Sequence, residues 1–231
     1  MNDKPNDTLI TLFPTLIMKC SDFLSKSEID EIFEILKSKP KEQHETLAIG
    51  GKSSHGMGMS NDLISSLGLE SRIQKKLDMY TNSLKLQKVA IDNSWFNIQD
   101  IGSILKLHMH TRSLISAALY INVDEKSSPL FFYNPNSLTH FTYSLTSKTQ
   151  SDFNFHHQSF QPKNGEMYIF PSWLLHGSND EQNKTKDRSA SVSDNYQDDS
   201  SDIEMGHIVN NFDEVDYGDY GLKKESFRIN F

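Results

Sequence analysis

The chain is predicted to form a mainly β domain, a sandwich or jelly roll, with helices placed before it. After Lys85, seven short segments rich in β-branched and aromatic residues are separated by Gly, Pro and Asn. Before Lys85, apolar residues recur instead at helical spacing. With 231 residues, 36% of them apolar, the chain can build the large single core that such a domain needs.

The N-terminal part is expected to hold one strand and one helix first. Thr8–Lys19 reads as a short apolar strand that Pro14 interrupts. Ser27, with Asp30 three residues later, looks like the N-cap of the helix, and Pro40 ends it. The apolar residues of this helix follow at helical spacing: Ile29, Ile32, Phe33 and Leu36.

A second helix is predicted from about Leu69 to Leu84, with Ile73, Leu77 and Tyr80 on one face. A glycine-rich loop, residues 49–59, precedes it. This loop lacks a Gly-x-Gly-x-x-Gly pattern, so it is not expected to bind phosphate. It is either a lid over a substrate or a plain surface loop.

The β part is expected to begin near residue 89 and to end near residue 195. The predicted strands are Val89–Asn97, Leu105–His110, Leu114–Val123, Leu130–Tyr133, Phe153–Phe160, Glu166–Phe170 and Arg188–Ser193. We therefore divide a single domain, 1–231, into three parts: an N-terminal strand and supporting helices (10–88), the β core (89–195) and an acidic C-terminal segment (196–231).

Charge and composition exclude several classes of protein. The net charge is −8, and ten acidic against three basic residues place −7 of it between Asp194 and Phe231. The rest of the chain is nearly neutral and offers no basic stripe for nucleic acid. No apolar run is long enough for a membrane span or a signal peptide. Cys20 is the single cysteine, which excludes an intrachain disulfide and fits a cytoplasmic setting.

Three histidines and an arginine form the most informative pattern. His108 and His110 are one residue apart on a predicted strand, so their side chains point to the same face. His176, on a later strand, could complete a facial three-ligand metal site, and the guanidinium of Arg188 could hold a carboxylate. Tyr120, in another predicted strand, could reach the same carboxylate or simply pack in the core. Each residue also has a purely structural explanation, and only their order favours a site.

Other histidines carry less information. His156 and His157 are adjacent, so they face opposite sides of a strand and at most one could join a site. His140 and His207 lie in polar surroundings without a clear signal.

Four stretches carry a family resemblance: residues 12–17 (LFPTLI), 94–110, which include Ser94-Trp95-Phe96-Asn97 and His108-Met109-His110, 116–121 (SAALYI) and 163–177 (KNGEMYIFPSWLLHG). With them the chain resembles the 2-oxoglutarate/Fe(II)-dependent oxygenases of the prolyl-4-hydroxylase-like type, known from phages and bacteria. The fourth stretch is the best match. The likeness extends from about residue 10 to residue 195.

The resemblance implies a double-stranded β-helix, which is a cupin-like jelly roll. It implies Fe(II) bound by His108 and His176, and 2-oxoglutarate held by Arg188 and Tyr120, with ascorbate as a supporting reductant. It further implies hydroxylation of a C–H bond, with a prolyl residue of a protein or peptide as the favoured target, in the cytoplasm of a bacterium or a phage-infected host.

Two departures from the family pattern bear on the site. His110 stands where the wider superfamily has Asp, so the third metal ligand would be neutral and the site one charge unit more positive. After Arg188 the serines fall one place late, so that Ala190 stands where a serine would assist the cosubstrate, and Ser191 is the nearest candidate. Arg228 is an alternative anchor if the acidic segment is an insertion.

Two other classes of function stay open. One is a cupin-like metalloprotein that does not use 2-oxoglutarate, and the other is a β-barrel interaction module without enzymatic activity. The expected partner is a protein or peptide substrate rather than nucleic acid or a membrane. A second copy of the chain in a homodimer is also open.

Overall fold

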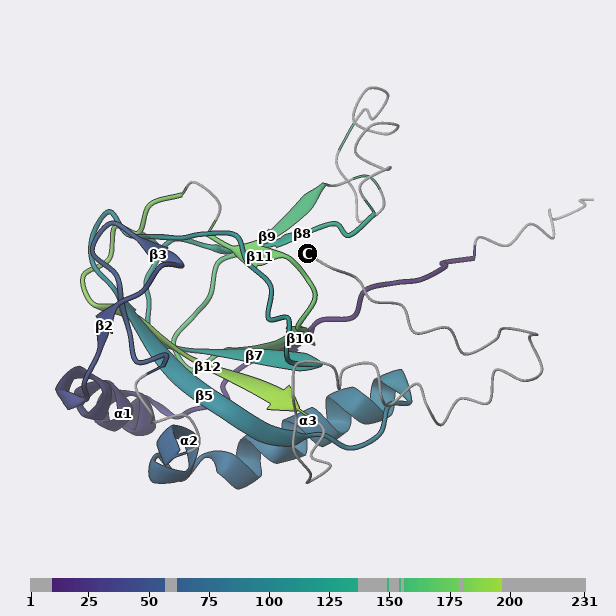
Figure 1. The fold of residues 1–231 in the computed structure, drawn as a ribbon, viewed down its shortest axis with the longest axis horizontal. Coiled ribbons are helices and arrows are strands. Elements are labelled where there is room, and N and C mark those ends of the chain that lie inside the picture. Colours follow the sequence, from purple (N-terminus) through teal and green to yellow (C-terminus); the bar gives the residue numbers. More distant parts are fainter. Residues whose placement is uncertain are drawn as a thin grey trace, which may run out of the picture. The chain divides into compact units, whose positions relative to one another are not determined.

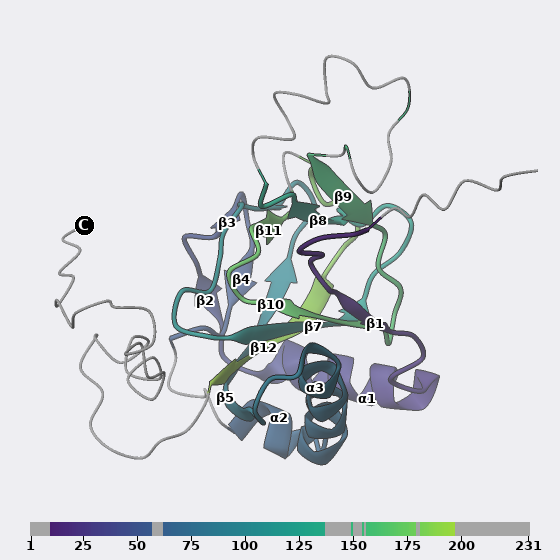
Figure 2. The same cartoon turned by 90° about the vertical axis from the view of Figure 1, so that its right-hand side faces the viewer.

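Two antiparallel β-sheets face each other, and helices cover the outer face of the larger one (Figures 1 and 2). The computed structural model describes residues 10–56, 62–136, 149, 154, 156–178 and 181–196. Residues 197–231 of the acidic C-terminal segment, which include Arg228 and His207, and His140 lie outside these ranges. No helix in the described ranges is long and apolar enough to cross a membrane.

The larger sheet has the strand order β1-β10-β7-β12-β5-β4-β2. Its strands are β1 (Met18–Cys20), β10 (Met167–Pro171), β7 (Ile115–Asn122), β12 (Arg188–Tyr196), β5 (Ala90–Gln99), β4 (Lys52–Ser53) and β2 (Glu42–Gln43). The smaller sheet is β11 (His176–Gly177), β8 (Leu130–Tyr133) and β9 (His157–Phe160), and β3 (Leu47–Ala48) pairs with β6 (Ile104–Leu105). The predicted jelly-roll core, preceded by helices, is confirmed.

The central strands of the larger sheet are buried on both faces. In β7, Ala117, Leu119 and Ile121 pack on the helices. The alternate residues Ala118 and Tyr120 belong to a second core between the two sheets. Because side chains alternate along a strand, one strand serves both cores. This explains why β7 reads as an almost continuous apolar run in the sequence.

The three helices are α1 (Lys26–Ser38), α2 (Asp62–Ser66) and α3 (Glu70–Leu84). The helix predicted from about Leu69 to Leu84 is confirmed as α3, which buries Ile73, Leu77 and Tyr80. The predicted N-cap of α1 was wrong. Ser25, not Ser27, caps the helix, because its side chain and that of Glu28 close a capping box with the opposite backbone groups.

Several predicted strand bounds also need correction. Within the described residues, Thr8–Lys19 forms regular strand only from Met18 onward. The strand expected over Leu105–His110 ends at Leu105, so the two histidines lie in an extended segment outside the named strands. His108 makes a single antiparallel bridge to His176 there. The short elements α2, β2, β3 and β4 were not predicted, because two to five residues give no measurable periodicity.

Glu166 joins the first strand to the sheet. It is buried beside β10, and its carboxylate accepts bonds from Lys19 Nζ (2.8 Å), Tyr168 Oη (3.1 Å) and the Lys163 N–H (3.1 Å). Burial alone would raise the pKa of Glu166, but these three donors together lower it. The same ion pair raises the pKa of Lys19.

A carboxyl group whose pKa is lowered by folding stabilises the fold above its unfolded pKa of about 4.5 and loses that contribution as the pH falls through the folded value. We therefore expect Glu166→Gln to reduce the free energy of unfolding at pH 7 by about 1 kcal/mol, and to flatten its decline below pH ~4.5. Denaturant unfolding at pH 7 and at lower pH values measures both the free energy of unfolding and its decline with pH. The exposed Glu31→Gln on α1 is the control and should keep the wild-type profile. An unchanged profile in Glu166→Gln would contradict this role.

Candidate active site

A cavity of about 600 Å³ lies between the two sheets. One face of β5 lines it with Asn93, Trp95, Asn97 and Gln99, four residues at a spacing of two. Ala118 and Tyr120 of β7 and Arg188 and Ala190 of β12 complete the floor. The alternation that buries Phe96 and Ile98 under the helices thus sends polar side chains into this space.

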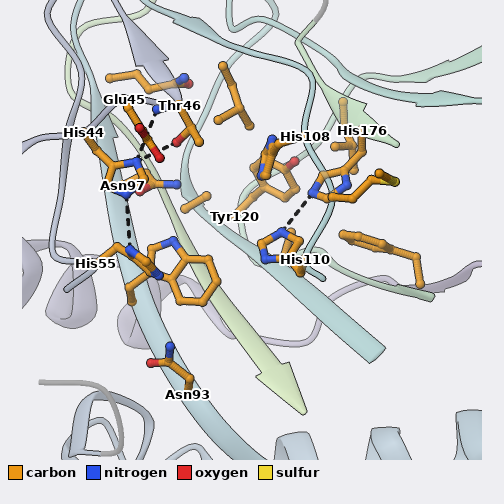
Figure 3. Close-up of a pocket in the computed structure, with 18 of the residues that line it drawn as sticks. His44, Glu45, Thr46, His55, Asn93, Asn97, His108, His110, Tyr120 and His176 are labelled. Carbon is orange, nitrogen blue, oxygen red and sulfur yellow. Dashed lines mark hydrogen bonds between the residues drawn. The ribbon is translucent and has the colours of Figure 1, made fainter. Parts of the chain in front are cut away.

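The three predicted metal-binding histidines come together at one end of the cavity (Figure 3). One ring nitrogen each of His108, His110 and His176 lies within 4.8 Å of the others, and this is the one such His, Cys or carboxylate group among the described residues. Two backbone hydrogen bonds hold His108 against His176, 2.9 and 3.0 Å long. A Cβ at Gly177 would lie 2.8 Å from the Leu105 carbonyl oxygen, so glycine permits this close approach.

Hydrogen bonds determine which ring nitrogens face the metal position. Nδ1 of His108 lies 2.9 Å from the Lys106 carbonyl, and Nδ1 of His176 lies 2.8 Å from the Leu174 carbonyl. Because a carbonyl only accepts, both Nδ1 atoms carry the proton and both Nε2 atoms present a lone pair.

Nε2 of His110 lies 3.2 Å from Nε2 of His176 (Figure 3). Two imidazoles bound at right angles to one metal, with bonds of about 2.1 Å, would have their nitrogens about 3.0 Å apart. His110 and His176 therefore fit two adjacent positions on one metal ion, and a ring nitrogen of His108 lies within 4.8 Å of both, where it could supply the third ligand.

Burial and the neighbouring imidazoles His108 and His110 lower the pKa of His176 well below its ordinary value. His176 is thus neutral near pH 7, as a metal ligand must be. A set of three neutral imidazoles leaves the charge of a divalent ion uncompensated, which favours anionic ligands at the open positions.

Arg188 and Tyr120 lie together on the floor of the same cavity. Arg188 is 4% exposed, its Nη1 donates to Oε1 of Gln99, and its guanidinium lies 5.4 Å from the centre of the Tyr120 ring. Its Nε has no hydrogen-bond partner, and no carboxylate within the described ranges forms an ion pair with it. A buried cation without a counter-charge is costly, so this position suits the acid group of a ligand.

Tyr120 is suited to donate a hydrogen bond to the same acid group. Burial raises its pKa to about 12, although the nearby charge of Arg188 acts in the opposite direction. The phenol therefore keeps its proton at physiological pH.

Ser191 lies elsewhere. It is buried, its hydroxyl donates to the Trp95 carbonyl at 3.4 Å, and it is not among the residues that line the cavity, whereas Ala190 is. That Ser191 binds the cosubstrate stays a prediction. His156 and His157 also lie outside the cavity lining.

Sequence reasoning missed the wall opposite the histidine group. His44 Nε2 lies 3.2 Å from His55 Nδ1, His44 Nδ1 lies 2.8 Å from Thr46 Oγ1, and Trp95 packs between His55 and His110 (Figure 3). Gln99 on the floor was missed as well. The available signal was the spacing of two between Asn93, Trp95 and Asn97 in the strand predicted over Val89–Asn97, which continues to Gln99 just beyond that predicted end.

Two of three comparisons with known proteins find similar proteins. Residues 93–195 match the family model described as "Putative 2OG-Fe(II) oxygenase". No curated protein matches the chain.

Among solved structures the chain is similar to HygX from Streptomyces hygroscopicus with nickel, 2-oxoglutarate and hygromycin B bound (12% identity, TM-score 0.58, covering 79% of this chain and 83% of that one). It is also similar to a Pseudomonas putida prolyl-4-hydroxylase (12% identity, TM-score 0.55, covering 80% of this chain and 94% of that one). A third similar structure is an oxidoreductase of the 2OG-Fe(II) oxygenase family from Burkholderia pseudomallei (8% identity, TM-score 0.57, covering 80% of this chain and 86% of that one). At these identities the likeness concerns the fold.

We expect His176→Ala to weaken the binding of Fe(II) by at least about 100-fold, because it removes a buried ligand whose orientation the Leu174 carbonyl fixes. Anaerobic titration of Fe(II) with a competing chelator measures the affinity. His156→Ala, outside the cavity lining, is the control and should bind iron as the wild type does. Equal affinity of both variants would refute the ligand assignment.

His110→Asp should bind Fe(II) with an affinity within about ten-fold of the wild type, since a carboxylate is also a good iron ligand. It should nevertheless bind 2-oxoglutarate more weakly than the wild type, because the site becomes one unit less positive. His110→Ala should lose iron affinity. If His110→Ala keeps wild-type affinity, His110 is not a ligand.

The segment that matches the family model, residues 93–195, contains all three histidines together with Tyr120 and Arg188.

Proposed function

We propose that the protein is an Fe(II)- and 2-oxoglutarate-dependent dioxygenase. The observation that carries the proposal is the presence, in one cavity, of three converging imidazoles and a buried guanidinium without a counter-charge. The first suits a metal ion with open coordination positions. The buried guanidinium suits a ligand that carries an acid group at some distance from that metal. 2-Oxoglutarate, with a keto acid at one end and a carboxylate at the other, meets both demands.

The assigned roles follow from the geometry. His108, His110 and His176 would hold Fe(II) through Nε2, with His108 and His176 oriented by the backbone carbonyls that accept from their Nδ1 atoms. Arg188 would pair with the distal carboxylate, and the protonated hydroxyl of Tyr120 would donate to it. Bound iron and 2-oxoglutarate would supply, together with O2, an oxidant for a C–H bond, with succinate and CO2 as by-products.

The apolar residues around the site would exclude water from this chemistry. Phe170 and Leu130 line the cavity, and the Phe170 ring lies 4.7 Å from that of His176. A dry surrounding strengthens the attraction between Arg188 and a carboxylate.

For the substrate we propose a protein or peptide, with hydroxylation of a prolyl residue as the favoured reaction. Large apolar residues are exposed close to the metal position: Met109 (50%), which lines the cavity, Leu114 (47%) and Trp173 (52%). The latter two are neighbours, because the Ser172 N–H donates to the Leu114 carbonyl. Exposed apolar surface beside a site suits a polypeptide. The likeness to a prolyl-4-hydroxylase adds support.

A small molecule is the second candidate substrate. HygX, which shares the fold, has hygromycin B in its structure. The polar wall formed by Asn93, Asn97, His44 and His55 would offer hydrogen bonds to a hydroxylated compound.

The experiment is the conversion of 2-oxoglutarate to succinate with Fe(II), O2 and ascorbate, against proline-containing peptides and aminoglycosides in parallel. We expect substrate-dependent succinate, and a loss of at least about 100-fold in kcat/KM for 2-oxoglutarate in Arg188→Ala, because the distal carboxylate then lacks its charged partner. Arg188→Lys keeps the positive charge but lacks the planar guanidinium, so its kcat/KM for 2-oxoglutarate should lie between those of the wild type and Arg188→Ala.

Each rival class predicts a different result. If the protein binds iron and converts a substrate without consuming 2-oxoglutarate, and Arg188→Ala leaves that conversion unchanged, the protein is a metal enzyme that does not use 2-oxoglutarate. If the purified chain binds neither iron nor 2-oxoglutarate, the reading as a non-enzymatic module replaces the proposal.

A further inference from the structure

Gln99 occupies a position that the roles assigned so far do not explain. It is the last residue of β5, it is directly opposite Arg188 in the register of β5 and β12, and it lines the cavity. It is only 1% exposed. The Asn183 side chain donates to its carbonyl oxygen at 3.2 Å, which holds the end of the strand in place.

The orientation of the Gln99 amide follows from its contact with Arg188. A guanidinium has donors only, so the atom of Gln99 that meets Nη1 must be Oε1. The amide nitrogen Nε2 then has to face elsewhere. It is buried, and it has no hydrogen-bond partner.

Two buried donors are therefore unpaired at the same place, Nε2 of Gln99 and Nε of Arg188. Buried donors are nearly always paired in folded proteins, and exceptions call for an explanation such as an absent ligand. Because both groups only donate here, the missing partner has to be an acceptor. A carboxylate, which has two oxygens and several lone pairs, can accept from both at once.

We propose that Gln99 is a third binding group for the distal carboxylate of 2-oxoglutarate, donating from Nε2 while its Oε1 holds Arg188. The carboxylate would then be bound from three adjacent strands, by Gln99 of β5, Arg188 of β12 and Tyr120 of β7. This inference rests on the proposed function and adds a selectivity determinant to it.

The proposal also explains why residue 99 is an amide rather than the isosteric acid. A glutamate here would form an ion pair with Arg188 and supply the counter-charge from within the protein. The cavity would then offer no net positive charge to a carboxylate. Glutamine holds the guanidinium in the same way but leaves its charge available to the ligand.

The test uses the Zn(II)-loaded protein, in which ligands bind without turnover, and isothermal titration with 2-oxoglutarate. 2-Oxopentanoate, which has the same carbon chain but no distal carboxylate, is the reference ligand. Gln99→Met, which is nearly isosteric, should weaken 2-oxoglutarate binding about ten-fold or more, since a hydrogen bond to a charged group is lost. Gln99→Glu should weaken it more than Gln99→Met does. Neither change should alter the affinity for 2-oxopentanoate.

Ser189→Ala is the matched control. Ser189 is fully buried and adjacent to Arg188, and its hydroxyl also has no partner, but it does not line the cavity. Its loss should leave both affinities unchanged. Thermal unfolding guards against damage to the fold, and Gln99→Glu should be at least as stable as the wild type, because Arg188 gains a counter-charge.

One spectroscopic signal distinguishes a Gln99 that donates a hydrogen bond to the carboxylate from a Gln99 that only positions Arg188. In the zinc-loaded wild type, the side-chain amide resonance of Gln99, assigned by its disappearance in Gln99→Met, should shift with 2-oxoglutarate and not with 2-oxopentanoate. An unshifted resonance, or wild-type affinity of Gln99→Met for 2-oxoglutarate, overturns the inference while the proposed function stands. If the wild type does not prefer 2-oxoglutarate over 2-oxopentanoate, the proposed function fails and the inference fails with it.

Discussion

Burial of the larger sheet on both faces is the constraint on which the rest of the structure depends. Its central strands pack against helices on one side and against the cavity and the smaller sheet on the other. A period of two then assigns each side chain to one side or the other, and a shift of one residue would exchange them. Phe96 and Ile98 of β5 join the helix-side core, while Trp95, Asn97 and Gln99 reach the cavity. The register that builds the core thus also builds the site.

The site depends on charges that the protein leaves unbalanced. Its candidate metal position is surrounded by three imidazoles, which carry no negative charge, and its floor holds a guanidinium whose partners are the neutral side chains Gln99 and Tyr120. Such an arrangement is unfavourable by itself, because a buried cation is stable only when it is paired. The proposed cosubstrate, as a dianion, would supply the missing negative charge at both ends. Binding and the relief of this imbalance would then be the same event.

Much of the scaffold could be predicted from the sequence, because it follows from periodicity. Ile73, Leu77 and Tyr80 identified α3, and the apolar run of Leu130–Tyr133 identified β8 within its observed bounds. The grouping of His108, His110 and His176 also followed from the pattern, although the reason differed. The first two lie in an extended segment held by backbone bonds to His176 and Ser172, and not in a regular strand.

The errors have physical causes. Ser25 and Ser27 are both acceptable N-caps, and only Glu28, three residues after Ser25, marks the first as the real one. Gln99 was missed because the alternating polar pattern alone does not distinguish a buried glutamine from a solvent-exposed one, and its significance depends on its burial and on its unpaired amide nitrogen. Ser191 follows the cavity-lining Ala190 by one residue, and in a strand one residue changes the face, so its role toward the cosubstrate stays a prediction.

The central claim is that the three histidines and Arg188 hold the two ends of one 2-oxoglutarate molecule. Anaerobic optical titration tests it most directly, because chelation of Fe(II) by a 2-keto acid produces visible charge-transfer absorption that neither component has alone. We predict that the absorption appears only when iron and 2-oxoglutarate are both present, and that it saturates at one equivalent of each. Binding of both components without the absorption would show that they occupy separate places, and would contradict the account.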